Sequence, residues 1–316
     1  MTTRTPIDGP TAWSTDTITV QDLTVDVPAD CRDDLAAIGA EITRRGLALA
    51  DLSPDMFAVP GLAGLAERIR SMLFAGPGAV IVRGWPLGEG DENLVSALYW
   101  GLGSVIGTPR GQNSKGDRVK LVTRRDALPA ANLESARRGS RSNSEIDFHT
   151  ENARPPVPPR IVGLLCLRNA AQGGESLVIS GHSVYNALLA EDNPALERLC
   201  EDFYFARSEP YDDGRVVDAE PVFRRDGDRL AVRFNRYWMD RGHEDAEQPL
   251  TEDARALAAV DAFEAVLGEK NLALEHLMQP GEILFVNNSV VLHKRNAFQD
   301  FEEVDRRRCL VRIWID

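Results

Sequence analysis

The chain has 316 residues, is 43% hydrophobic and 27% charged, and carries a formal net charge of −13. This composition is ordinary for a soluble globular protein, and a chain of this length can bury a substantial core in one β-rich domain. The acidic balance argues against a nucleic-acid partner, because binding a polyanion requires a basic surface. No apolar run approaches the ~20 residues of a membrane span, and residues 1–10 lack the apolar centre of a signal peptide. We therefore expect no membrane attachment.

The four cysteines lie far apart in the sequence and form no C-x-x-C pair: Cys31, Cys166, Cys200 and Cys309. Scattered cysteines of this kind are typical of reduced thiols buried in a cytoplasmic protein. They predict a cytoplasmic location and argue against a zinc site built from thiolates.

The N-terminal part of the chain, about residues 30–102, is predicted to be helical after a loose lead-in over residues 1–30. Apolar residues recur there at helical spacing, and one short apolar run is bounded by glycines. The expected elements are a short strand at 17–20 or 23–27, helices at 30–46, 62–74 and 92–101, and a buried strand at 78–84.

Residues 110–141 form a basic island in this acidic chain, with nine lysines and arginines opposed by three acidic residues. Residues 124–144 show no hydrophobic periodicity, and a loop this long in a compact domain is usually functional. We expect this segment to be a lid that attracts an anionic substrate. The alternative is a solvated loop whose arginines only keep the protein soluble.

Short strands predominate after the basic island, and they favour a β-rich fold. The clearest helix in this part covers residues 251–267, with Thr251 as its N-cap before an acidic first turn. Many short strands, with helices concentrated early, predict one domain over residues 1–316, a mainly β jelly roll (double-stranded β-helix) decorated with helices. The other expected elements are strands at 118–122, 161–167, 175–180, 221–223, 230–234, 272–276, 282–286, 290–292 and 308–315, and helices at 183–189 and 194–201.

The sequence FHTEN at residues 148–152 carries the main chemical signal. His149 and Glu151 are separated by one residue, so in an extended segment their side chains point to the same face. An imidazole and a carboxylate are two-thirds of the facial triad of non-haem Fe(II) oxygenases. An H-x-E sequence recurs by chance, so a second histidine must complete the set. His293, at the end of the expected strand 290–292, is the best candidate. The remaining histidines are expected to be exposed or hydrogen-bonded: His182, His243 and His276.

The last predicted strand, residues 308–315, alternates between two faces. One face is wholly apolar and is expected to be core. The other carries Arg308 and Arg312, together with Leu310 and Trp314. A guanidinium binds a carboxylate through two parallel hydrogen bonds, so these arginines are candidate anion ligands. The alternative is an outer face whose arginines lie in solvent.

The motifs together resemble the Fe(II)/2-oxoglutarate-dependent dioxygenases of the TauD/TfdA and clavaminate synthase-like superfamily. They occur in the family's order over most of the chain from about residue 75 onward, with a jelly-roll core expected over about 76–316. The matching pieces are Phe148–Asn152, Val162–Asn169, Gly173–Ser176, Pro280–Asn288, Val291–Arg295 and Arg308–Arg312.

The resemblance implies a role for each matching residue. His149, Glu151 and His293 would bind Fe(II), which leaves positions on the metal for the ketoacid and for O2. Arg308 and Ser176 would bind the distal carboxylate of 2-oxoglutarate, the co-substrate. Arg312 matches a position that in some members meets an anionic substrate group. Gln112 and Asn152 are further candidate contacts with the substrate.

The implied reaction is hydroxylation of an unactivated C–H in an amino acid or related small metabolite, anionic or zwitterionic, with release of succinate and CO2. The H-x-E sequence is similar to that of amino-acid β-hydroxylases, whereas the turn Gly173–Ser176 is more like the TauD branch. Glu151 excludes the halogenase variant, which lacks this carboxylate. Open alternatives are a substrate bound to a carrier protein, and desaturation, epoxidation or cyclisation. A remote one is a binding or sensor protein that has lost turnover.

Overall fold

The computed structural model describes residues 5–88, 91–113, 115–123, 143–151, 158–207, 216–227 and 229–316. Its centre is a pair of β-sheets that face each other. The larger sheet has six strands in the described part of the chain. Their spatial order is β1 (Thr24–Asp26), β2 (Ala79–Arg83), β13 (Ile283–Asn287), β5 (Ile161–Arg168), β16 (Cys309–Ile315) and β3 (Lys120–Thr123).

Neighbouring strands of the larger sheet are antiparallel except β1 and β2, which are parallel. The smaller sheet has four antiparallel strands among the described residues. Their order is β12 (Ala273–His276), β7 (Ser176–Ser180), β14 (Val291–Arg295) and β4 (Ile146–His149). His293 therefore lies in the middle of β14, and not at a strand end as the sequence suggested.

A core of interior-facing side chains fills the space between the two sheets. It includes Cys166 from β5, Val178 from β7 and Leu310 from β16. This arrangement confirms the predicted jelly roll. The described strands leave the two sheets facing each other without a closed barrel.

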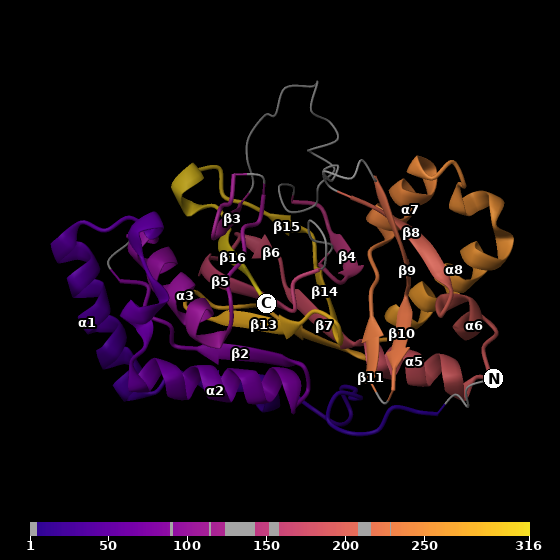
Figure 1. Cartoon of the computed structure of the whole chain (residues 1–316), viewed down its shortest axis with the longest axis horizontal. Helices are drawn as coiled ribbons and strands as arrows, with labels where there is room; N and C mark the ends of the chain where they lie inside the picture. Colours follow the sequence, from indigo (N-terminus) through magenta and orange to yellow (C-terminus); the bar gives the residue numbers. More distant parts are fainter. Residues whose placement is uncertain are drawn as a thin grey trace.

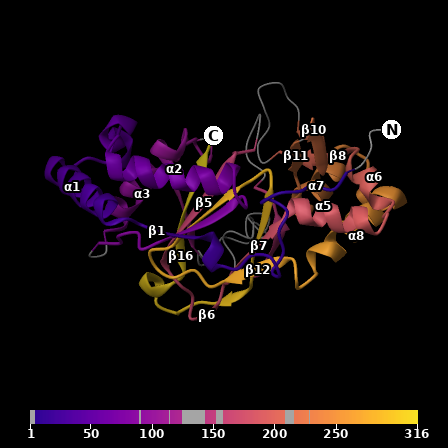
Figure 2. The same ribbon diagram turned by 90° about the horizontal axis from the view of Figure 1, so that it is seen from below.

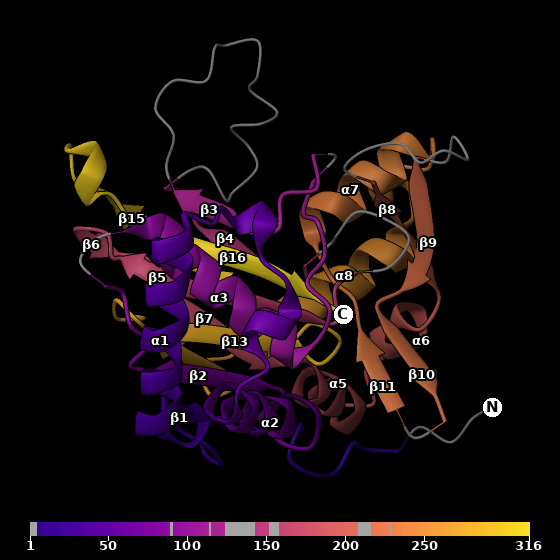
Figure 3. The same ribbon diagram turned by 60° about the vertical axis from the view of Figure 1, so that its left-hand side comes forward.

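The outer face of the larger sheet is covered by α1 (Ala29–Arg45), α2 (Pro60–Phe74) and α3 (Glu92–Ile106). Figure 3 shows these helices in front of the strands of that sheet. Because the helices pack on alternate residues of β16 while Leu310 and Trp314 face the interior, both faces of β16 are buried. The alternative of a solvated arginine face is therefore wrong. Short 3-10 turns complete this part: η1 (Gln21–Leu23), η2 (Leu49–Asp51), η3 (Pro54–Phe57) and, farther along, η6 (Leu250–Glu252) and η7 (Val304–Arg306).

A second helical group covers the outer face of the smaller sheet, so the expectation of helices concentrated early is wrong. Figures 1 and 2 show the two groups on opposite flanks of the sheets. Its helices are α5 (Gly181–Ala190), α6 (Ala195–Leu199), α7 (Arg236–Asp245) and α8 (Ala254–Leu267). Two small two-stranded sheets accompany them: β8 (Asp202–Ala206) with β9 (Val217–Pro221), and β10 (Phe223–Asp226) with β11 (Arg229–Val232). A third pair, β6 (Gln172–Gly173) with β15 (Phe298–Gln299), lies away from these helices (Figure 1).

Helix α7 has no counterpart among the elements expected from sequence, because its sequence is charged and contains Gly242. A Cβ at Gly242 would come within 2.5 Å of backbone atoms of β8, so the glycine permits the helix to approach that strand closely. Asn235 caps the helix by accepting a hydrogen bond from the N–H of Trp238. The helix is short and polar overall, and it buries Met239, Gly242 and His243 on one face.

Helix α8 begins later than predicted. Its N-cap is Asp253, whose carboxylate accepts from the N–H of Ala256 at 2.9 Å. Thr251 lies in the preceding turn η6. The prediction of Thr251 as the cap is therefore wrong by two residues.

The described part of the lead-in, residues 5–30, is anchored rather than loose. Trp13 is 2% exposed and belongs to the core between the sheets. Its indole N–H donates to the carbonyl of Pro77 at 2.8 Å, and its own carbonyl accepts from the hydroxyl of Ser183 at 2.6 Å. This segment therefore joins the two halves of the molecule.

The expected lid falls mostly outside the described residues, since 124–142 are not among them. Its last two residues hold the chain at the smaller sheet: Asn143 accepts from the N–H of Phe298, and Ser144 accepts from the side chain of Arg295. Two cations of the basic island have structural contacts. Arg110 pairs with Asp316 at 3.1 Å, and Arg118 donates to the carbonyls of residues 49 and 52. No helix in the described ranges is long and apolar enough to cross a membrane.

Candidate metal centre and active site

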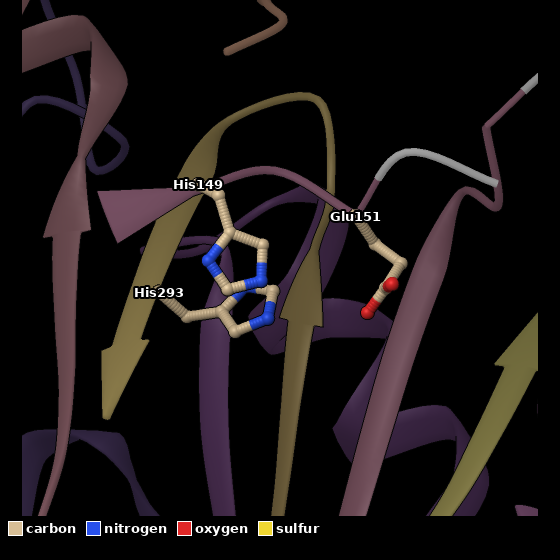
Figure 4. Close-up of side chains that lie close together, drawn as sticks. All are labelled: His149, Glu151 and His293. Atoms are coloured by element: carbon tan, nitrogen blue, oxygen red, sulfur yellow. The ribbon is translucent and has the colours of Figure 1, made fainter. Parts of the chain in front are cut away.

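Two histidines and one glutamate meet at the edge of the smaller sheet. His149 ends β4 and faces His293 of β14 directly across the antiparallel pair, with ring centroids 4.3 Å apart. Glu151 lies two residues beyond β4, and one ligand atom from each of the three residues lies within 4.8 Å of the others. Figure 4 shows the carboxylate turned toward the two imidazoles. The spacing predicted for His149 and Glu151 and the choice of His293 agree with this geometry.

The hydrogen bonds of this cluster leave metal-binding atoms available. Nδ1 of His149 lies 2.8 Å from the carbonyl oxygen of Asp147. A carbonyl can only accept, so Nδ1 carries the proton and Nε2 keeps its lone pair. Nδ1 of His293 is buried and has no hydrogen-bond partner among the described residues. A buried polar atom of this kind needs a partner, which a metal ion or its ligands would supply.

Electrostatics favour the neutral form of His293. Burial, followed by the nearby His149 and Arg312, holds its pKa well below the usual range. A neutral imidazole is the form that binds metal ions. Two imidazoles and one carboxylate on one side of a metal form the facial triad typical of non-haem Fe(II) sites. The three residues therefore fit Fe(II).

Glu151 is held at both its side chain and its backbone. One carboxylate oxygen accepts from Nη1 of Arg312 at 3.0 Å. Its N–H donates to the side-chain oxygen of Asn288 at 2.7 Å, and its carbonyl accepts from the same amide at 3.1 Å. The other carboxylate oxygen remains available to a metal.

Arg312 is fixed by three contacts on the inner face of β16. Its Nε donates to the side-chain oxygen of Gln112 at 2.8 Å, while the Gln112 amide donates to the carbonyl of Arg312 at 2.8 Å. The guanidinium carbon lies 4.4 Å from the ring centroid of Trp314. Nη2 donates to no acceptor among the described residues. The site thus has a buried, rigid cation beside Glu151.

Arg308 lies directly before the first residue of β16, so the strand begins one residue later than predicted. Arg308 is 5% exposed, and its guanidinium makes no hydrogen bond or ion pair with any residue in the described ranges. Its Nε lies against Gly174, where a Cβ would approach to 3.1 Å. Ser176, two residues after Gly174, is buried and faces the interior. Of the two candidate co-substrate residues, Ser176 therefore lies in β7 and Arg308 lies directly before β16.

Arg295 is a buried residue to which the sequence analysis gave no role. It lies opposite Ser176 in the β14–β7 pairing. Its guanidinium and that of Arg308 lie 4.7 Å and 5.3 Å from the ring centroid of Phe298. Burial and the charge of Arg308 lower the pKa of Arg295 to about 9. Two buried cations therefore share one region near Ser176.

The structure brings together most of the predicted site residues. His149, Glu151 and His293 form one cluster, with Arg312 and Gln112 beside it. Asn152, assigned to substrate binding from the sequence, lies outside the described residues. The other histidines are hydrogen-bonded, as expected: His182 with Thr11 and Leu230, His243 with Tyr204 and Gln248, and His276 with Glu282.

Comparison with known families decides the identity of the chain. The family model described as "Taurine catabolism dioxygenase TauD, TfdA family" matches residues 48–314. The chain belongs to this family. It is an oxidoreductase, an iron- and 2-oxoglutarate-dependent dioxygenase, and the resemblance seen in its sequence motifs is confirmed.

Two curated relatives are similar over most of the chain. FR-33289 synthase of Streptomyces rubellomurinus is 29% identical over 292 residues, which cover 90% of this chain and 82% of the relative. Taurine hydroxylase-like protein SAT17 of Stachybotrys chartarum is 27% identical over 304 residues, which cover 89% and 72%. This TauD-family chain therefore matches biosynthetic and hydroxylase-like proteins along nearly its whole length.

Solved structures of iron oxygenases share the fold. Asparagine oxygenase in complex with Fe(II), (2S,3S)-3-hydroxyasparagine and succinate has a TM-score of 0.70 at 22% identity and covers 93% of each chain. The non-haem iron oxygenase OrfP with Fe and α-ketoglutaric acid has a TM-score of 0.67 at 19% identity and covers 92% of this chain and 93% of its own. These likenesses show that the chain shares the fold of those oxygenases.

Proposed function

We propose that this TauD-family enzyme hydroxylates an unactivated C–H of an amino acid or related small metabolite that carries a carboxylate. His149, Glu151 and His293 would hold Fe(II), and Arg308 with Ser176 would bind the distal carboxylate of 2-oxoglutarate. The observation that carries the substrate class is Arg312. A buried guanidinium fixed beside a metal ligand binds an anionic group of the substrate in a defined orientation.

The charge of Arg308 supports the co-substrate assignment. A buried cation without a partner is costly, so a site that retains one is built to receive an anion. Within the described residues, Arg308 has the aromatic ring of Phe298 but no carboxylate that pairs with its guanidinium. A dicarboxylic ketoacid with one end at the metal supplies such a carboxylate.

The catalytic contribution of the chain is positioning. With iron bound by His149, Glu151 and His293, the site would supply the chemistry by which O2 oxidises both reactants: one oxygen atom goes to succinate, with loss of CO2, and the other goes to the substrate C–H. Nη2 of Arg312 receives the substrate carboxylate, and the Gln112 side chain keeps that guanidinium in place. Apolar interior residues such as Leu310 and Trp314 exclude water from the reacting groups. A substrate held in this way presents the C–H near its carboxylate.

Two structural neighbours act on amino acids and support this class. Asparagine oxygenase was solved with a 3-hydroxyasparagine, and OrfP with (3S)-hydroxy-L-Arg and succinate. Both products carry the new hydroxyl on carbon 3. We accordingly propose carbon 3 of an α-amino acid as the first position to examine.

Succinate release in the presence of Fe(II), 2-oxoglutarate and O2 tests the proposal. Free amino acids should stimulate succinate release. Arg312→Lys keeps the positive charge but loses the two parallel N–H donors of the guanidinium. It should raise the KM for the amino acid about tenfold or more, since a buried hydrogen-bonded charge pair is worth ~2–5 kcal/mol. The control His149→Ala lacks one of the three metal ligands and should release no succinate. The proposal would lose its basis if Arg312→Lys left the KM for the amino acid unchanged. It would also lose it if no carboxylate-bearing substrate stimulated succinate release.

The same assay separates the remaining alternatives. A carrier-bound acid that stimulates succinate release better than every free amino acid would favour a carrier-protein partner. Mass analysis of the product separates two groups of reactions. Hydroxylation and epoxidation add an oxygen atom, whereas desaturation and cyclisation remove two hydrogens. The proposed outcome is hydroxylation of a free amino acid.

We further propose that residues 1–316 act as one domain in the cytoplasm. Strands from both ends of the chain share the larger sheet, β1 at one edge and β16 near the other. The four cysteines are free thiols, three of them buried, which suits a reducing compartment. Limited proteolysis that left one resistant core, and cell fractionation, would test both statements.

A further inference from the structure

We propose that Asn288 is a positioning residue that fixes the backbone of Glu151 and thereby sets the carboxylate at the iron. The inference rests on the proposed function in one respect: Glu151 must be an iron ligand. Asn288 is 4% exposed, so its amide is shielded from competing water. Its printed contacts with the metal cluster are to the backbone of Glu151 and not to a metal-binding atom, so Asn288 acts through Glu151.

The Asn288 side chain makes three hydrogen bonds to backbone groups. Its oxygen accepts from the N–H of Glu151 at 2.7 Å, and its nitrogen donates to the carbonyl of Glu151 at 3.1 Å and to that of Pro159 at 3.0 Å. The side-chain amide of Asn288 therefore holds both the N–H and the carbonyl of Glu151. An asparagine suits this task because its side chain both accepts and donates.

Glu151 needs this support because it lies beyond the end of the sheet. Strand β4 ends at His149, so ladder hydrogen bonds do not extend to Glu151. Thr150 is anchored on the opposite side, where its N–H donates to the carbonyl of Phe234 at 2.7 Å and its hydroxyl oxygen accepts from the N–H of Phe234 at 3.0 Å. Asn288 completes the support, and Arg312 then orients the carboxylate.

The position of Asn288 also links two of the three ligands. It lies in the turn between β13 and β14, three residues before β14 begins, and His293 is the third residue of β14. The turn that delivers His293 to the site therefore holds Glu151 as well. Outer residues that orient metal ligands typically change metal affinity or activity by about 10–100-fold when mutated.

The neighbouring Asn287 provides a matched control. It is 7% exposed, and its side chain also makes three hydrogen bonds, donating to the carbonyl of Leu73 at 3.0 Å and accepting from the N–H and hydroxyl of Ser289 at 3.1 and 2.8 Å. These bonds tie the turn to α2 and do not reach Glu151. Loss of either asparagine should lower stability, but only loss of Asn288 should alter the iron site.

The experiment compares Asn288→Asp and Asn288→Ala with Asn287→Asp and Asn287→Ala in the full chain. Asn288→Asp keeps the shape but turns a carboxylate oxygen toward two carbonyls that it cannot satisfy. Anaerobic Fe(II) titration with 2-oxoglutarate, followed by the visible charge-transfer band, gives metal affinity. We expect both Asn288 variants to bind Fe(II) about 10–100-fold more weakly with a shifted band, and both Asn287 variants to match the parent.

A second measurement uses the metal-free protein and keeps the test independent of turnover. Hydrogen exchange of the Glu151 amide should accelerate at least about tenfold in Asn288→Ala, which removes its acceptor, and stay unchanged in Asn287→Ala. Equal Fe(II) affinity and equal exchange in the Asn288 and Asn287 variants would overturn the inference while leaving the proposed function intact. Failure of the parent protein to bind Fe(II) with 2-oxoglutarate would overturn both.

Discussion

The three candidate iron ligands depend on different kinds of local support. His149 is oriented by the backbone carbonyl two residues before it, whereas Glu151 relies on two side chains that are distant in the sequence, Asn288 in a turn and Arg312 in β16. His293 has a buried Nδ1 without a partner among the described residues. At the residue scale, His149 is therefore positioned by its own strand, and Glu151 is positioned by Asn288 and Arg312. Substitutions of the side chains that contact Glu151 should therefore change the metal affinity over a wider range than substitutions near His149, which is oriented by a backbone group.

Arg308 provides a prediction at the residue scale. Arg308→Gln should raise the KM for 2-oxoglutarate roughly thirtyfold or more, because loss of a desolvated charge partner costs ~2–5 kcal/mol and ~1.4 kcal/mol corresponds to tenfold. Succinate release measured against 2-oxoglutarate concentration gives this KM. Arg306→Gln is the control, since Arg306 is exposed and lies 3.6 Å from Glu303. A larger effect in Arg306→Gln would show that the co-substrate carboxylate binds elsewhere.

At the scale of single elements, hydrogen-bonded ends and close approaches matter as much as hydrophobic faces. Helix α1 follows its apolar pattern, with Leu35, Ile38 and Ile42 buried as predicted. Helices α7 and α8 instead begin at Asn235 and Asp253, whose side chains accept from backbone N–H groups. An acidic cap also interacts favourably with the helix dipole. Capping geometry therefore decides boundaries that periodicity leaves open.

Helix α8 gives a prediction for this scale. Asp253→Ala should lower the free energy of unfolding by about 1 kcal/mol, the usual cost of losing an N-cap, whereas Thr251→Ala should change it by less than about 0.5 kcal/mol. Urea unfolding followed by circular dichroism measures both. Asp253→Asn separates the cap from the contact with Arg198 at 3.6 Å, because asparagine retains the cap without the charge. A greater loss in Thr251→Ala would contradict the observed helix start.

At the scale of the whole molecule, the segment before β1 joins parts that are far apart in the chain. Trp13 contacts the turn before β2 through Pro77 and the start of α5 through Ser183. Ser180 adds a hydrogen bond to the carbonyl of Thr11. The segment therefore contributes to the common core and to the packing of both helical groups.

Trp13 provides the prediction for the whole molecule. Trp13→Ala should lower the free energy of unfolding by about 3–5 kcal/mol, the range for removing a buried large aromatic side chain. The control is Tyr237→Ala, because Tyr237 is an aromatic residue of α7 with 43% exposure; it should cost less than about 1 kcal/mol. Denaturant unfolding curves give both values. Equal losses would mean that the N-terminal segment is dispensable for the core.

The sequence by itself determined the features that depend on local spacing. Helical spacing of apolar residues located α1 and α2, apolar runs located β2 and β5, and alternation located β16. The separation of His149 from Glu151 predicted a shared face. The order of motifs led to the family and to His293, Arg308 and Ser176. The inferences from spacing succeed because neighbouring residues in a regular element have fixed relative directions.

Only the tertiary structure decided the contacts between residues distant in the chain. Glu151 is hydrogen-bonded to Asn288 and to Arg312, which lie 137 and 161 positions away in the sequence. Gln112 is hydrogen-bonded to Arg312, 200 positions away. The same holds for Arg295 beside Arg308, for the close approach of α7 at Gly242 and for the anchoring of Trp13. No local pattern encodes such pairs, because they follow from the order and register in which strands pair into sheets. That register is what converts two histidines and a glutamate into one site.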